Sequence, residues 1–89
     1  MAKKDLPYQV VCLKVAELLR QERLRQELSL SSVATRAGLS YQMISYVERG
    51  LRVPGLDTLL RITAALRLDA ADLLRQAQAA PSKVGRANS

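Results

Sequence analysis

The sequence contains no histidine, tryptophan or phenylalanine, and Cys12 is its only cysteine. A zinc site built from cysteine and histidine cannot form, and neither can a disulfide within the chain. Catalysis by a histidine base or by a Cys–His pair is excluded for the same reason. No apolar run approaches the roughly 20 residues that a membrane-spanning helix needs. We therefore expect a cytoplasmic protein with no metal, no cofactor and no enzymatic activity.

Aromatic residues are scarce, whereas basic residues are abundant. The three aromatic residues are all tyrosines, while hydrophobic residues make up 48% of the 89 residues, so the core must be aliphatic. Runs rich in Leu and Ala favour helices over strands. Fourteen Lys and Arg against eight Asp and Glu give a net charge of +6. This charge on a small domain is typical of nucleic-acid-binding proteins, although a merely soluble basic surface has the same composition.

Apolar residues recur at helical spacing in five segments, and no segment alternates with the period of a strand. The predicted helices begin near Pro7, Ser29, Ser40, Leu56 and Asp69. We therefore expect an all-α fold, a compact five-helix domain over residues 7–79. An N-terminal arm over residues 1–6 and a flexible basic tail over residues 80–89 flank it.

The first predicted helix is unusual because its first half is apolar on all sides, at Val10, Val11, Cys12 and Leu13. A helix with one core face would carry polar residues here. The segment therefore either packs on two sides or forms an extended arm, and both alternatives stay open. Cys12 is expected to be a small buried hydrophobic residue rather than a redox sensor.

Residues 29–49 have the plan of a helix-turn-helix. Ser29 and Ser40 are favourable N-caps for two short helices, and Gly38 suits the left-handed conformation that ends the first of them. Ile44 and Val47 lie three residues apart and are expected to hold the second helix to the core. The spacing alone is moderately specific, because short helical hairpins are common in bundles.

Landmarks on both sides of this motif extend the pattern. From Leu28 to Leu74 the chain resembles the lambda-repressor-like DNA-binding domain, and in particular the XRE family of small bacterial and phage transcriptional regulators. The matching landmarks are Leu28-Ser29, Val33-Ala34, Gly38, Ser40, Ile44-Ser45, Glu48-Arg49-Gly50, Pro54, Leu59-Leu60, Leu66, Asp69 and Leu73-Leu74. Arg20 and Arg23 continue the match back into the first predicted helix.

The resemblance implies that Tyr41–Glu48 is the recognition helix, which lies in the major groove of DNA. Its outward side chains are then the candidates for base contacts: Tyr41, Gln42, Ser45 and Tyr46. The amide of Gln42 can pair with the N6 and N7 edge of adenine, whereas the short Ser45 reaches bases through water.

The resemblance also implies which residues bind the phosphate backbone, the contacts that position such a domain and supply most of its affinity. Arg49 and Arg52 flank the turn after the recognition helix and are the first candidates, and Arg36 is the second. Ser29 would let its helix point backbone N–H groups at a phosphate. Leu30 stands where many relatives have a Gln that binds the backbone, which removes the support for one such contact.

Two acidic residues near these elements call for explanation. Glu27 stands where a Gly commonly ends the first helix in the family, so we expect the turn before Leu28 to be tighter or shifted. Glu48 would be repelled by DNA if its carboxylate faced the duplex. The resemblance instead pairs Glu48 with Arg23 of the first helix, as a structural ion pair.

A single short recognition helix reads few base pairs, so specificity normally needs a two-fold dimer on half-sites about 34–36 Å apart. We therefore expect a homodimer on a pseudo-palindromic operator in double-stranded DNA. Its interface should be an exposed apolar patch outside the motif. The favoured patch contains Leu66, Leu68 and Leu74, and the Val10–Leu13 face is the alternative.

The expected function is that of a sequence-specific DNA-binding transcriptional regulator, similar to small restriction–modification controller proteins and phage repressors. The alternative is an antitoxin, which neutralises a partner toxin protein and represses its own operon with the same kind of domain. The sequence leaves open whether a toxin or RNA polymerase is a partner, and whether binding represses or activates.

Overall fold

The computed structural model describes the backbone of residues 7–87 and the side chains of residues 7–79. Within this range the chain forms five helices and no strand, which confirms the all-α prediction. The helices are α1 (Tyr8–Arg25), α2 (Leu30–Ala37), α3 (Tyr41–Glu48), α4 (Leu56–Ala65) and α5 (Ala70–Ala87). None of the described helices is long and apolar enough to cross a membrane.

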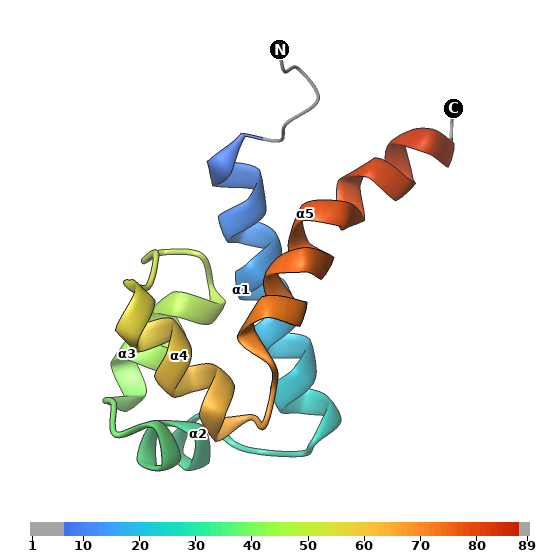
Figure 1. Ribbon diagram of the computed structural model, residues 1–89. Coiled ribbons are helices and arrows are strands. Elements are labelled where there is room, and N and C mark those ends of the chain that lie inside the picture. Colours follow the sequence, from blue (N-terminus) through green and yellow to red (C-terminus); the bar gives the residue numbers. More distant parts are fainter. Residues whose placement is uncertain (1–6, 88–89) are drawn as a thin grey trace.

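The two long helices, α1 and α5, pack against each other, and the three shorter helices lie on one side of them (Figure 1). α2 packs against both α3 and α4, and α3 also packs against α1. The six largest fully buried side chains come from the first four helices and from the residue that follows α4. They are Leu19, Val33, Ile44, Val47, Ile62 and Leu66. All are aliphatic, as predicted, and each contributes about 1.5–3 kcal/mol by its removal from water.

Three helices begin at the predicted N-caps. Ser29, Ser40 and Asp69 each accept a hydrogen bond through a side-chain oxygen from a backbone N–H two or three residues later, at 3.0, 3.0 and 2.9 Å. These bonds satisfy donors that the first turn of a helix leaves without a partner. Gly38 ends α2 in the left-handed conformation, with φ of 71°. The local chemistry of the sequence thus sets the bounds of the helix-turn-helix.

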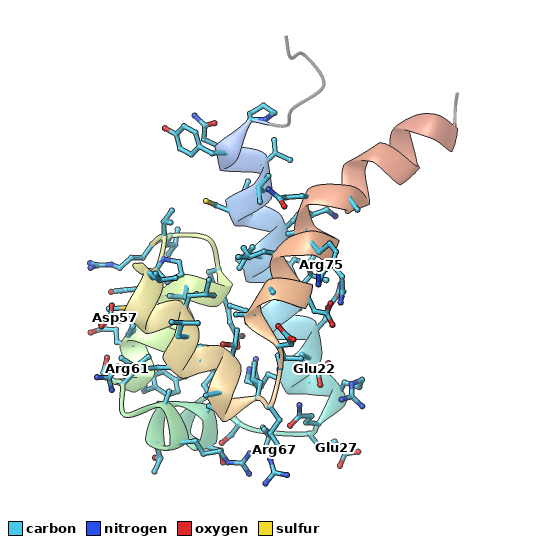
Figure 2. All side chains as sticks on the ribbon, in the orientation of Figure 1. Glu22, Glu27, Asp57, Arg61, Arg67 and Arg75 are labelled. Atoms are coloured by element: carbon cyan, nitrogen blue, oxygen red, sulfur yellow. The ribbon has the colours of Figure 1, made fainter. Side chains whose placement is uncertain are left out.

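Two further turns use a left-handed residue that is not glycine. Glu27 after α1 and Arg67 after α4 both have φ of 59°, and Figure 2 shows them at the same end of the molecule. The N–H of Leu28 donates to the carbonyl of Arg23 at 3.1 Å, as in a turn that glycine would make. Glu27 therefore takes the place of the usual Gly without the expected shift of the turn, at the cost of a strained conformation.

The two ends of the domain differ from the expectations. α1 is helical from Tyr8, so the alternative of an extended arm at Val10–Leu13 is wrong, and Cys12 is half-buried rather than buried. α5 continues to Ala87, past the point where the sequence analysis placed the start of the tail. The alanines before residue 80 favour a helix, and the helical backbone continues past them through Pro81. The predicted arm, residues 1–6, lies outside the described residues, as do residues 88 and 89.

Candidate nucleic-acid interface

Two fully buried side chains hold the helix α3 to the core, and the polar residues of its first turn are exposed. Ile44 and Val47 are each only 1% exposed and pack into the core, as predicted. On the rest of the helix, Tyr41 and Gln42 are exposed, while Ser45 is half-buried. The core contacts thus fix the rotation of α3 about its axis and leave a polar surface at its N-terminal half.

A cluster of one tyrosine and two arginines lies at the other end of α3. The guanidinium carbon of Arg49 lies 5.6 Å from the centroid of the Tyr46 ring, and that of Arg52 lies 6.0 Å from it. A cation over an aromatic face at this distance is attracted by the negative charge of the ring face. The predicted phosphate contacts Arg49 and Arg52 therefore converge on Tyr46, which was predicted to contact bases.

Arg36 on α2 and Arg61 on α4 each donate a hydrogen bond to the end of the other helix. The guanidinium of Arg36 donates to the carbonyl of Ala65 at 3.4 Å, and that of Arg61 donates to the carbonyl of Ala37 at 3.5 Å. Each carbonyl lies at the C-terminus of its helix, where a positive charge is stabilised by the helix dipole. The structure thus places Arg36, the second candidate for a phosphate contact, against the end of α4.

Ser29 caps α2 through its hydroxyl, which accepts from the N–H of Ser32. The first turn of α2 contains no acidic side chain. Its remaining N–H groups and the helix dipole therefore give this end a partial positive charge that suits a phosphate.

Arg23 and Glu48 form the ion pair that the resemblance implied, and it is bidentate. Arg23 donates to the two carboxylate oxygens of Glu48 at 2.8 and 3.0 Å, and a third bond, of 2.9 Å, joins its Nη1 to the carbonyl of Leu28. The two side chains are only 11% and 6% exposed. The carboxylate at the end of α3 is therefore turned inward and neutralised, so it does not repel a polyanion.

The predicted dimer patch is only partly exposed. Leu66 is 1% exposed and belongs to the core, so its assignment to an exposed interface is wrong. The turn at Arg67 folds the chain back and encloses the Leu66 side chain within the monomer. Leu68 is half-buried against the core, and Leu74 on α5 is 37% exposed.

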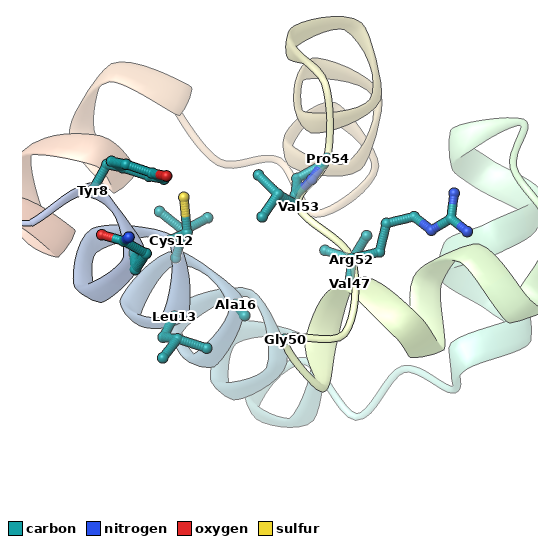
Figure 3. A pocket seen from close by; sticks show the side chains of 11 residues that line it. Tyr8, Cys12, Leu13, Ala16, Val47, Gly50, Arg52, Val53 and Pro54 are labelled. Carbon is teal, nitrogen blue, oxygen red and sulfur yellow. The ribbon is translucent and has the colours of Figure 1, made fainter.

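The alternative face, on α1, borders an apolar groove that the sequence analysis missed. Its walls are the first turns of α1 and the loop between α3 and α4, and it encloses about 240 Å³ (Figure 3). Leu13 on α1 and Val53 in the loop, 57% and 65% exposed, lie on opposite walls. The signal for this wall in the sequence is the apolar residue Val53 between Gly50 and Pro54, which by themselves indicate only a turn.

No three His, Cys, Asp or Glu side chains among the described residues lie together where they could hold a metal ion. The described arrangement at α3 is a polar helix face bordered by arginines.

A model of the helix-turn-helix family matches residues 19–73, more than half of the chain. The chain belongs to the helix-turn-helix family. The matched range contains all of α2, α3 and α4. The resemblance to XRE-type transcriptional regulators that the sequence indicated is therefore confirmed.

The helix-turn-helix chain has relatives among curated proteins. An uncharacterized HTH-type transcriptional regulator of Mycobacterium tuberculosis is 42% identical over 52 residues, which are 58% of this chain and 37% of the relative. An uncharacterized HTH-type transcriptional regulator of Sinorhizobium fredii is 36% identical over 55 residues, which are 62% of this chain and 28% of the relative. The chain therefore spans about a third of the length of these curated relatives.

Solved structures match more of the helix-turn-helix chain. The restriction-modification controller protein C.AhdI from Aeromonas hydrophila is 31% identical, with a TM-score of 0.66, and the match covers 70% of this chain and 94% of that protein. A variant of another controller protein, solved on its highest-affinity operator site, has a TM-score of 0.70 at 20% identity over 76% of this chain and 90% of that one. The second likeness shows the shared fold.

Proposed function

We propose that this helix-turn-helix protein is a sequence-specific DNA-binding transcriptional regulator that binds a pseudo-palindromic operator as a homodimer. One observation carries the proposal: α3 is anchored by Ile44 and Val47, presents Tyr41, Gln42 and Ser45 outward, and ends in arginines that pair with no carboxylate among the described residues. A rigid polar helix with a cationic end is suited to the major groove and its phosphates.

Base readout falls to the N-terminal half of α3. Tyr41 and Gln42 are exposed, and the Gln42 amide offers the donor and acceptor that adenine requires. Ser45 is half-buried, so it reaches a base edge through a bridging water. Tyr46, the fourth predicted base contact, lies between the guanidinium groups of Arg49 and Arg52 and the core instead.

Phosphate binding falls to the ends of the motif. Arg49 and Arg52 would neutralise phosphates beyond the C-terminus of α3, and the N-terminus of α2, capped by Ser29, would bind another. Arg36 contributes to a lesser degree, because its guanidinium already contacts the end of α4. Most of the affinity should therefore depend on salt.

Dimerisation would double the number of base pairs that are read. Leu74, with the exposed part of Leu68, is the proposed interface, since Leu66 is enclosed. The test is sedimentation of Leu74→Glu beside Leu13→Glu, a matched change on the α1 face. We expect only Leu74→Glu to yield a monomer, and a monomer from Leu13→Glu alone would move the interface to α1.

The function is tested by binding to the DNA upstream of the protein's own gene and to a random duplex, over a salt series. A regulator should prefer the upstream DNA by about 10³ or more. Gln42→Ala should lower that preference by about 1–3 kcal/mol while the fold stays intact. Equal and steeply salt-dependent binding to both duplexes would refute sequence-specific regulation and would favour the antitoxin alternative.

A further inference from the structure

Tyr46 lies in the last turn of α3, and two cations share its ring. The guanidinium carbons of Arg49 and Arg52 lie 5.6 and 6.0 Å from the ring centroid. Tyr46 is half-buried, whereas both arginines are exposed. The ring is thus partly enclosed by its surroundings, and the two exposed cationic side chains rest on it.

Helical periodicity explains the position of Arg49, three residues after Tyr46, but not that of Arg52. The chain reverses at Gly50, which has φ of 74°. The N–H of Leu51 then donates to the carbonyl of Tyr46 at 2.9 Å. Figure 3 shows the Arg52 side chain leaving the loop and extending away from Tyr8 and Cys12, along α3. The turn therefore brings the Arg52 side chain back to Tyr46, whose carbonyl accepts the hydrogen bond that closes the turn.

In the described part of the chain, Arg49 and Arg52 are the arginines that rest on an aromatic ring. Among the described residues, Arg23, Arg25 and Arg75 pair with carboxylates, and Arg36 and Arg61 contact carbonyl groups. Two like charges brought to one place repel each other, and the negative face of an aromatic ring offsets part of that repulsion. An anion bound by both guanidinium groups would offset the rest.

Free arginine side chains lose considerable rotamer entropy when a phosphate immobilises them. A ring that already restricts both side chains lowers this loss. We propose that Tyr46 is a positioning residue of the DNA interface, whose ring holds Arg49 and Arg52 ready for backbone phosphates and does not read a base. This inference rests on the proposed function, because it assigns the cluster to the same DNA surface.

The test compares Tyr46→Phe and Tyr46→Leu on two probes, a duplex selected from a random library and a random-sequence duplex. Phe keeps the aromatic face and loses the hydroxyl, so its affinity for both probes should equal that of the wild type. Leu removes the ring, and both affinities should fall equally, by about 5- to 30-fold if both cation–π contacts are lost. Tyr41→Leu is the matched control on the same helix and should weaken binding to the selected duplex alone.

A double-mutant comparison shows whether Tyr46 acts through the arginines. In an Arg49→Ala/Arg52→Ala background, Tyr46→Leu should cause no further loss of affinity. A melting curve of each variant accompanies the binding data. If Tyr46→Leu melts below the assay temperature, Tyr46→Met replaces it, because Met keeps an unbranched apolar side chain.

Three results would overturn the inference. The first is a loss in Tyr46→Leu that is confined to the selected duplex, as for a base contact. The second is a loss in Tyr46→Phe as large as that in Tyr46→Leu, which would assign the role to the hydroxyl group. The third is an undiminished loss in the Arg49→Ala/Arg52→Ala background. Failure of the proposed function is a separate result, in which the wild type itself selects no duplex or binds DNA without salt dependence.

Discussion

Replacing Arg23 by Ala should lower the free energy of unfolding of the domain. It should not remove a DNA contact selectively. Arg23 and Glu48 are joined by two bonds of 2.8 and 3.0 Å, and their side chains are 11% and 6% exposed. Arg23→Ala would leave the Glu48 carboxylate buried without a partner and would also free the Leu28 carbonyl. Breaking a buried pair in this way costs about 3–5 kcal/mol.

This loss is large relative to the total stability of a small domain, which is about 5–15 kcal/mol. Each kilocalorie shifts the melting temperature of a domain of this size by about 4–8 °C. Thermal melting followed by circular dichroism should therefore show a drop of more than about 12 °C. The matched control is Arg25→Ala on the same helix, whose partner Glu22 lies three residues away. The Arg25 side chain is 70% exposed, so this variant should melt close to the wild type.

A second variant separates the charge from the packing. Replacing both partners, as Arg23→Met with Glu48→Leu, leaves no buried charge and should recover most of the stability that Arg23→Ala loses. An Arg23→Ala protein that melts like the wild type and yet binds DNA poorly would refute the reasoning. Arg23 would then be a DNA-contacting residue rather than a structural one.

Three further perturbations test single features of the backbone and of the charges. Glu27→Gly should raise the free energy of unfolding in urea by about 1 kcal/mol, because Gly adopts the left-handed conformation without strain; Glu27→Ala, which keeps that strain, should not. The hydrogen bond from Arg25 lowers the pKa of Glu22 below its usual range. Glu22 therefore adds to the free energy of unfolding above the ordinary pKa of a glutamate, and this contribution is lost as the pH falls through the lowered pKa. In that pH window, the free energy of unfolding of Glu22→Gln should depend less on pH than that of the wild type. Gly50→Ala should lower the melting temperature, because a Cβ there would lie 2.8 Å from Leu13 Cδ2 at φ of 74°; Leu13→Ala in the same chain should restore only the part due to that contact.

Local features were the most predictable from the sequence. The N-caps at Ser29, Ser40 and Asp69, and the stop at Gly38, follow from side chains that act on their own neighbouring backbone. The buried face of α3 followed from the spacing of its apolar residues. Such signals need no knowledge of how distant segments pack.

The features that depended on chain reversals were not predictable. In the sequence, Leu66 looks like the last residue of an apolar helix face. Only the left-handed turn at Arg67 shows that the chain encloses the Leu66 side chain. The approach of Arg52 to Tyr46 likewise depends on the turn at Gly50. The apolar first half of α1 forms one wall of the groove. The opposite wall is a loop about 40 residues later in the chain.

The absence of tryptophan and the aliphatic core have a practical consequence for optical measurements on this molecule. Its near-ultraviolet emission comes from three tyrosines, and the described residues place all of them outside the fully buried core. Two of the three, Tyr41 and Tyr46, belong to α3. Tyrosine fluorescence is therefore a built-in reporter of events on the surface of α3 and a poor reporter of core packing, so a duplex free of other fluorophores can be titrated without attaching a dye.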